Sequence, residues 1–195
     1  MAGRILLVAA VVAAISFAAA PARSAGALPA ERGLASAPAY LVSRRPTLAP
    51  YAFVRFCRDN PADCRRATGA DVVALTPSRA RALSRINGRI NREIRPVREA
   101  GGGDRWAADV AAGDCEDVAL TKRRALVTAG WPARALRLAT TRTASGEGHA
   151  VLVLRTTRGD LVLDNRSAAI RPWRQTDLDW LKIQSADDPR LWHAL

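Results

Sequence analysis

The chain has 195 residues, of which 49% are hydrophobic and 25% are charged, a composition typical of a folded protein rather than a disordered one. Its 30 Lys and Arg residues outnumber its 18 Asp and Glu residues and give a formal net charge of +12 at pH 7. The arginines are scattered and no nucleic-acid-binding motif is present. A basic chain invites a nucleic-acid partner, but the scattered arginines, the lack of a motif and the export expected below argue against one. An acidic polymer, a membrane surface or an acidic protein is favoured instead, and the charge alone does not choose among them.

The first 22 residues have the pattern of a secretory signal peptide. Arg4 gives a positive start, residues 5–20 form an apolar run, and an Ala-Pro-Ala sequence offers cleavage after Ala22, with a cut nearer Ala25 as an alternative. A membrane anchor is the competing interpretation, but the run is shorter than the roughly 20 residues that span a bilayer. Cleavage after Ala22 removes Arg4 and leaves a net charge of +11 (12 − 1). We therefore expect a periplasmic protein with no membrane span after cleavage.

The next segment, 23–50, is rich in Ala, Pro, Ser and Arg, and we expect it to be a flexible lead-in to one domain at 51–195. At the start of that domain, Cys57 and Cys64 are close enough to form a disulfide across a short Asn-Pro turn. This pairing leaves Cys115 as an unpaired thiol. Either it is a buried core residue, or it is a reactive nucleophile.

The stretch between Thr76 and Pro96 is the clearest predicted helix. Thr76 is suited to cap it, and Pro77 suits its first turn. Its apolar residues recur at spacings of three and four and predict one buried stripe, formed by Leu83, Ile86, Ile90 and Ile94. The glycine-rich sequence EAGGGDRWAAD that follows lacks the spacing of a phosphate-binding loop, so we interpret it as a flexible connection.

A second helix is predicted over 115–129. Asp114 is its candidate N-cap, Asp117 is placed to complete an acidic capping box, and Gly130 ends the helix. The three consecutive basic residues at 122–124, Lys-Arg-Arg, are expected to be solvated.

Three strand-like runs follow, at 133–141, 149–156 and 160–165, and the turn residues between them predict an antiparallel meander. The sequence TDLDWL at 176–181 is expected to add a short helix. Three tryptophans are expected to pack along the sheet edge, namely Trp173, Trp180 and Trp192. The predicted class is α+β, with helices packed on an antiparallel sheet.

The spacing of these elements suggests a catalytic site formed by Cys115, His149 and Asp164. Cys115 lies in the first turn of its helix, where free N–H groups and the helix dipole favour a thiolate and suit an oxyanion. His149 starts one strand and Asp164 ends the next, so an antiparallel hairpin brings them side by side. Each residue alone is more often structural. Together they match a nucleophile, a base and a residue that orients the base.

The sequences GDCED, GHAVLVL and LVLDN, together with VRFCRDNPADC, INGRINREIRP and DRW, resemble the bacterial transglutaminase-like cysteine proteinases. The resemblance runs from about residue 54 to the C-terminus. It implies a transglutaminase-like, papain-like fold in which Cys115, His149 and Asp164 form the triad. It also implies a protein substrate, such as a surface adhesin released by periplasmic members of the family, and a regulatory receptor is a further possible partner.

The same resemblance implies a calcium requirement, with Asp114 and Glu116 as ligands and Asp117 as a further candidate. Carboxylate oxygens suit a hard cation, and calcium would offset the negative charge that otherwise raises the pKa of the neighbouring thiol. The competing interpretation is that these acids only cap the helix and complement its dipole. Two features depart from the family pattern: AADVAA after DRW, and Ala150 after the histidine.

These observations favour a periplasmic cysteine endopeptidase. Two alternatives stay open at this point. The same triad could transfer the acyl group to an amine, as in a transglutaminase, or the chain could be a non-catalytic binding module that retains a vestigial site.

Overall fold

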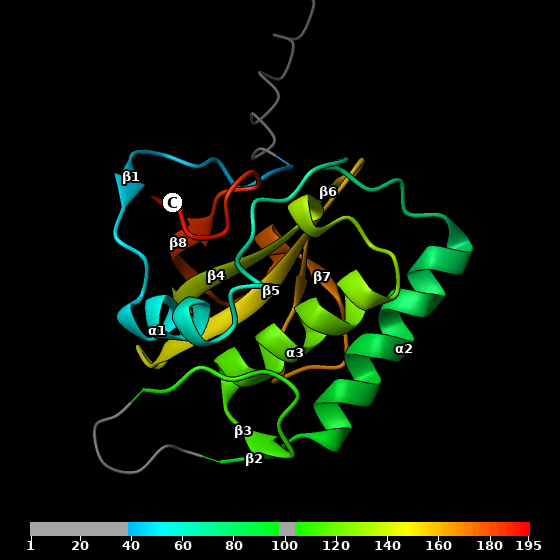
Figure 1. Cartoon of the computed structure of the whole chain (residues 1–195). Coiled ribbons are helices and arrows are strands. Elements are labelled where there is room, and N and C mark those ends of the chain that lie inside the picture. Colours follow the sequence, from blue (N-terminus) through cyan, green and yellow to red (C-terminus); the bar gives the residue numbers. More distant parts are fainter. Residues whose placement is uncertain (1–38, 98–103) are drawn as a thin grey trace, which may run out of the picture. The chain divides into compact units, whose positions relative to one another are not determined.

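The structure, a computed structural model, describes residues 39–97 and 104–195 (Figure 1). The helices of this part of the chain are α1 (Tyr51–Asp59), α2 (Pro77–Glu93) and α3 (Cys115–Thr128), with short 3-10 helices η1 (Ala133–Ala135) and η2 (Trp173–Gln175). None of the helices in these two ranges is long and apolar enough to cross a membrane. The predicted signal peptide, 1–22, lies outside the described residues.

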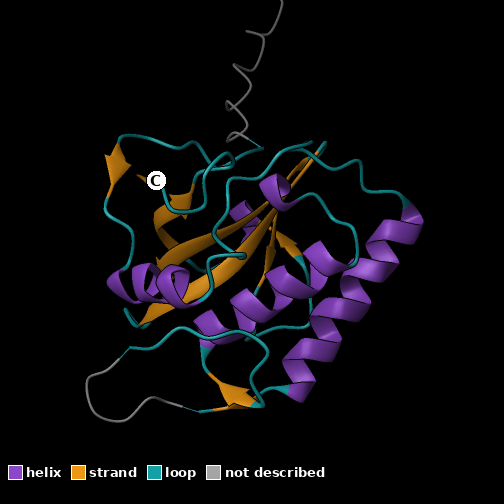
Figure 2. Cartoon of the chain, in the orientation of Figure 1, coloured by secondary structure: helices purple, strands orange, loops and turns teal. Residues whose placement is uncertain are grey.

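One antiparallel sheet forms the centre of the described domain, with α3 against its strands and α2 beside α3 (Figures 1 and 2). In spatial order its strands are β1 (Pro46–Thr47), β9 (Trp192–Ala194), β8 (Asp179–Gln184), β4 (Leu136–Arg142), β5 (Gly148–Thr156), β6 (Gly159–Leu163) and β7 (Arg171–Pro172). Two further short strands, β2 (Arg95–Pro96) and β3 (Ala112–Gly113), pair in parallel immediately before α3.

The sheet is buried on both faces. On the helix face, Leu152 and its neighbours pack with Phe53 of α1 and Leu126 of α3. On the opposite face, Val151 packs in a second cluster that includes Leu41. Because successive strand residues point to opposite faces, the continuous apolar run of β5 is explained by burial on both sides.

Helix α2 begins and packs as its sequence predicts. The Arg79 N–H donates to the Thr76 hydroxyl at 3.3 Å, and Pro77 is the first helical residue. Leu83 and Ile90 of the predicted stripe are 1% and 2% exposed. The apolar stripe is therefore core packing, as expected.

The predicted antiparallel meander is also confirmed. β4 pairs with β5 along its whole length, and β5 pairs with β6 across a tight turn at 157–158. The first strand starts later than expected, because residues 133–135 form η1. The predicted α+β class is correct.

The predicted helix at 176–181 is wrong. Residues 179–184 form strand β8, which pairs with β4 on one side and β9 on the other, and Ile183 is fully buried between them. The tryptophans do not form one edge cluster either. Trp173 and Trp180 pack edge to face with ring centroids 6.2 Å apart on one face of the sheet, whereas Trp192 lies in the core on the other.

The expectation that the basic run on α3 is solvated is wrong. Helix α3 lies between the sheet and α2, so Lys122 is 0% exposed and Arg123 is 7% exposed. Arg123 donates to backbone carbonyls, and Arg124 forms an ion pair with Asp63 at 2.7 Å. Lys122 Nζ has no hydrogen-bond partner among the described residues. Burial lowers the pKa of Lys122 to about 7, although the charge of nearby Asp164 opposes that effect.

Residues 39–50 belong to the folded domain rather than to a flexible lead-in. β1 pairs with β9, Leu41 is 4% exposed, and the Leu41 N–H donates to the Asp160 carboxylate at 2.8 Å. A two-residue strand is too short to produce a period in the sequence, which is why this segment looked irregular. The rest of the expected lead-in, 23–38, lies outside the described residues.

The Cys57–Cys64 disulfide is present, and Cys115 is the free cysteine. Cys57 lies on α1, a helix that we did not predict, and the disulfide fixes the chain that leaves this helix.

Candidate active site

Cys115 is the first residue of α3, and the segment directly before it, β3 and Asp114, is tightly packed against the helix start. Asp114 occupies the N-cap position with an extended backbone, but its side chain makes no capping hydrogen bond. The Asp117 carboxylate instead accepts the Ala107 N–H at 2.7 Å. It also lies so close to Gly113 that a Cβ there would be 2.9 Å from its carboxyl carbon. These contacts fix the start of the helix and hold the thiol at its positive end.

The Cys115 thiol is held by two neighbours. It donates to Glu116 Oε2 at 3.0 Å and accepts from the Ala150 N–H at 3.4 Å. Burial and the adjacent Glu116 carboxylate raise the pKa of Cys115, and the Ala150 N–H only partly opposes them. The pKa of the thiol therefore lies above its usual value in this arrangement, despite its place at the helix start.

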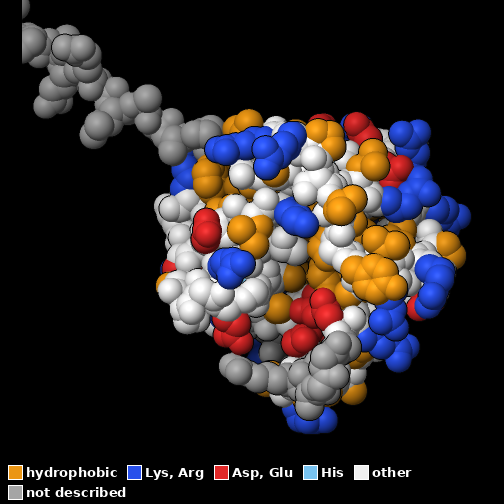
Figure 3. All heavy atoms as spheres, turned by 90° about the vertical axis from the view of Figure 1, so that its left-hand side faces the viewer, with side chains coloured by type: hydrophobic (Ala, Val, Ile, Leu, Met, Phe, Trp, Pro, Cys, Tyr) orange, Lys and Arg blue, Asp and Glu red, His pale blue; other side chains and the backbone are white. Residues whose placement is uncertain are grey.

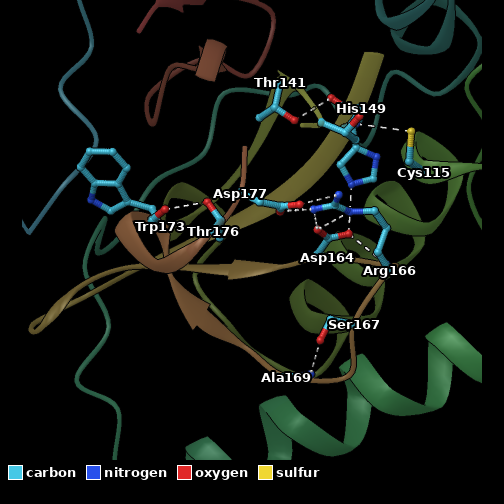
Figure 4. A network of polar contacts seen from close by, with 12 residues as sticks. Cys115, Thr141, His149, Asp164, Arg166, Ser167, Ala169, Trp173, Thr176 and Asp177 are labelled. Atoms are coloured by element: carbon cyan, nitrogen blue, oxygen red, sulfur yellow. Dashed lines mark hydrogen bonds and ion pairs between the residues drawn. The ribbon is translucent and has the colours of Figure 1, made fainter. Parts of the chain in front are cut away.

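The hairpin of β5 and β6 brings His149 and Asp164 together as the sequence predicts. His149 Nε2 and Asp164 Oδ1 are 3.0 Å apart, and both side chains are buried. The carbonyl of His149 accepts from the Thr141 hydroxyl on β4 at 3.2 Å, which anchors the start of β5. Figure 4 shows the imidazole between Asp164 and Cys115, with its second ring nitrogen, Nδ1, facing the cysteine.

Asp164 is held as a carboxylate by a second partner, Arg166. Arg166 Nε and Nη2 both donate to Asp164 Oδ2, at 3.0 and 2.9 Å, and the Arg166 N–H donates to Oδ1 at 2.9 Å. Burial alone would raise the pKa of Asp164, but the hydrogen bonds from His149 and Arg166 outweigh it and hold the pKa well below its usual range. An ionised Asp164 can only accept, so Nε2 carries a proton and Nδ1 is free to accept one.

Cys115 and His149 open onto a cleft of about 720 Å³. Apolar side chains, including Pro50, Trp106 and Leu181, form much of its lining. Figure 3 shows this face of the molecule, where acidic side chains gather at one end of an apolar hollow.

The acidic end of the cleft is lined by Asp104, Asp114 and Glu116. Burial raises the pKa of Glu116 to about 8; the hydrogen bond from Cys115 opposes this, and interactions with Asp104 and Asp114 add to it. No group of three or more His, Cys, Asp and Glu side chains in residues 39–97 and 104–195 is already arranged to hold a metal ion. The three acidic side chains therefore share one end of the cleft without forming a ready-made metal site there.

Sequence reasoning missed two residues of this site. Arg166 follows Asp164 by two positions, and an arginine so close to a carboxylate was a signal for the ion pair that forms. Asp104 belongs to the DRW sequence, but nothing local indicated that its carboxylate would interact with Glu116 across the cleft end.

Comparison with protein families assigns this geometry to a known class. The family model of the bacterial transglutaminase-like cysteine proteinases matches residues 43–195. The chain belongs to this family. The match includes the Cys115 helix and the His149–Asp164 hairpin, and membership implies a transglutaminase-like cysteine peptidase that acts on a protein.

Solved structures of one bacterial protein are similar to this chain in fold. Calcium-bound LapG of Legionella pneumophila is 26% identical, with a TM-score of 0.53, over 62% of this chain and 71% of that chain. EGTA-treated LapG of the same organism is 27% identical, with a TM-score of 0.51, over 59% and 67%. No curated protein sequence matches this chain. The similarity supports the transglutaminase-like α+β fold of this bacterial cysteine proteinase.

Proposed function

We propose that the chain is a periplasmic cysteine endopeptidase with Cys115, His149 and Asp164 as its catalytic triad. The observation that carries the proposal is the 3.0 Å hydrogen bond between His149 and Asp164, made beside a free cysteine at the start of a helix. Export is supported by the signal-like first 22 residues and by the Cys57–Cys64 disulfide, because disulfides persist in oxidising compartments.

In the proposed reaction, His149 Nδ1 removes the thiol proton and the Cys115 sulfur attacks the carbonyl carbon of a peptide bond. The Cys115 N–H at the helix start donates to the resulting oxyanion. The imidazolium protonates the leaving amine, the C–N bond breaks, and an acyl-enzyme remains. His149 then deprotonates a water that attacks the thioester, which releases the acid and the thiol. Asp164 holds Nε2–H and stabilises the imidazolium throughout.

The resting contacts of the thiol imply an activation step. Cys115 donates to Glu116 at 3.0 Å, so it has to leave this carboxylate before it can donate to His149. The raised pKa of Cys115 also opposes deprotonation; burial is its main cause, and the neighbouring Glu116 adds to it.

We propose calcium as the cofactor that changes this environment, held by Asp104, Asp114 and Glu116. All three line one end of the cleft, and carboxylate oxygens suit a hard cation. The described side chains are not arranged to hold a metal ion as they stand, so binding would require them to move closer together. When bound, calcium would supply positive charge next to these acidic side chains. Asp117, the other candidate from the sequence, is already engaged by the Ala107 N–H, so we assign it a structural role.

Calcium titration by calorimetry tests this assignment directly, in a Cys115→Ala background that separates binding from chemistry. We expect Glu116→Gln to weaken binding by at least about tenfold, since it removes a charged ligand. Asp117→Asn is the matched control and should leave affinity unchanged. Equal affinities for Glu116→Gln and its parent would contradict the assignment.

The nucleophile is tested by the rate at which iodoacetamide alkylates Cys115, with calcium and with EGTA. We expect labelling to be faster than that of a model thiol when calcium is present, and to slow at least about tenfold in His149→Ala. His193→Ala is the matched control, because it changes the other histidine of the chain. Labelling no faster than a model thiol's, and unaffected by His149→Ala, would refute the triad.

The acyl acceptor, water or an amine, is tested with a labelled amine. Incubation with this amine distinguishes hydrolysis, for which we expect no incorporation, from transglutaminase-type transfer.

The substrate is tested separately. A cell-surface or periplasmic protein such as an adhesin is the substrate class implied by the family resemblance. Mass spectrometry of proteins that co-purify with Cys115→Ala would identify such a substrate or a regulatory receptor. A phenotype that survives Cys115→Ser would instead favour a non-catalytic binding module.

A further inference from the structure

An exposed apolar surface lies beside the proposed active-site cleft. We call it the apolar platform and define it by four residues: Leu48, Tyr51, Val54 and Leu191. Their exposed fractions are 84%, 77%, 51% and 55%, and they make up most of the large hydrophobic side chains that are exposed in residues 39–97 and 104–195.

The fold brings these four residues together from three elements. Tyr51 and Val54 are one turn apart at the start of α1, so their side chains are neighbours on the outer face of that helix. β1 pairs with β9 in the register that sets Thr47 opposite Trp192, and Leu48 and Leu191 are the next residues of the two segments beyond that pair.

Helix α1 does not need this surface in order to fold. Its opposite face buries Phe53 and Phe56 in the main core, at 2% exposure each, and these two residues pack the helix onto the domain. Tyr51 and Val54 are therefore apolar residues that this packing does not use. Large apolar side chains that are exposed on neighbouring segments of a folded domain commonly mark a surface that binds a partner.

The segment that carries Leu48 and Tyr51 also reaches the cleft. Pro50, which lies between Leu48 and Tyr51 in the chain, lines the cleft that contains Cys115. Leu181 lines the same cleft, and its neighbour Lys182 donates to the Leu48 carbonyl at 3.0 Å. Figure 3 shows apolar side chains along this face, with the acidic group at the end of the hollow.

We propose that the apolar platform binds an apolar side chain of the substrate polypeptide, a few residues away from the bond that is cleaved. This inference rests on the proposed peptidase function and specifies its substrate class. An extended chain advances about 3.3 Å per residue, so a segment lying through the cleft past Pro50 reaches the platform within a few residues of the scissile bond. The preferred substrate is therefore a flexible segment with an apolar or aromatic residue at one fixed distance from the cleavage point.

The test uses a positional-scanning library of internally quenched peptides, cleaved by the mature protein in the presence of calcium. We expect the wild-type protein to prefer an apolar residue at one position two or more residues from the cleaved bond. The double variant Leu48→Ser, Tyr51→Ser should lose about tenfold in kcat/KM for such peptides, mostly through KM. For peptides truncated before that position, the variant and the wild type should be equal. Val127→Ser, which changes a 38% exposed valine on α3, is the matched control.

The possible outcomes separate the inference from the proposed function. If the wild type cleaves no peptide, the peptidase function itself fails. If it cleaves peptides but the double variant keeps the same positional preference, the platform inference alone is wrong. The last control has two parts. Thermal unfolding should show that the wild type and the double variant are equally stable, and analytical sedimentation then compares their oligomeric states. Self-association that the double variant abolishes would assign the platform to a second copy of the chain and overturn the inference.

Discussion

Replacing Lys122 with methionine is expected to stabilise the fold. Lys122 is fully buried, its amino group has no hydrogen-bond partner among the described residues, and its neighbourhood lowers its pKa from 10.5 to about 7. Methionine has nearly the same volume and no charge, so it fills the same space without the cost of burying an ammonium group.

The magnitude follows from the two pKa values. Each pH unit between them corresponds to about 1.4 kcal/mol, so burial of the charged form costs about 4 kcal/mol at pH 7 as an upper estimate. Between pH 7 and 10.5 the unfolded chain binds more protons at this residue than the folded one, so wild-type stability rises with pH across that window. The advantage of Lys122→Met is therefore largest below pH 7 and should be about 3 kcal/mol smaller at pH 9 than at pH 6.

Urea unfolding followed by tryptophan fluorescence at pH 6 and pH 9 measures this difference, because Trp106 and Trp192 are buried in the core. Lys182→Met changes the only other lysine of the chain and should alter the free energy of unfolding by no more than about 0.5 kcal/mol. A Lys122→Met protein that is no more stable than the wild type, or equally stabilised at both pH values, would refute the reasoning.

Three further variants have definite expected outcomes. Gly113→Ala should lower the free energy of unfolding by about 1–3 kcal/mol, because the new methyl group would displace the Asp117 carboxylate; unchanged urea unfolding would mean that this carboxylate moves freely. The low pKa of Asp164 contributes stability above about pH 4 that is lost at lower pH, so Asp164→Asn should be less stable at pH 7 and less sensitive to acid. An acid transition identical to the wild type's would contradict this. Replacing Cys57 and Cys64 with serine should destabilise the domain by about 2–3 kcal/mol, and a reductant should then have no further effect on thermal unfolding.

The parts of the site that sequence patterns predicted are those specified by local signals. A cysteine directly after an N-cap position must lie at a helix start, and two strands joined by a tight turn must form an antiparallel hairpin. These two rules were enough to bring His149 beside Asp164, whereas the packing of the Cys115 helix against their hairpin was only a condition of the prediction, which the structure meets. The apolar stripe of α2 was predictable for the same reason.

The parts that could not be predicted depend on contacts between distant segments. Residues 179–184 are a strand because β4 and β9 both supply partners, and no local pattern carries that information. The buried Lys122 has a similar cause. An amphipathic interpretation assumes that a helix has an open face, but α3 is covered by the sheet and by α2, so even its basic residues are enclosed.

The cleft is assembled from separate stretches of chain. The proposed nucleophile, base and orienting carboxylate all come from one continuous stretch, 115–164, whereas walls of the cleft come from the segment around Pro50, from Trp106 and from Leu181. A change confined to the short segment from β1 to the first turn of α1 would therefore alter the substrate preference of a relative and leave its catalytic residues unchanged. Grafting that segment from one family member onto another would be a practical route to a protease with a redirected preference.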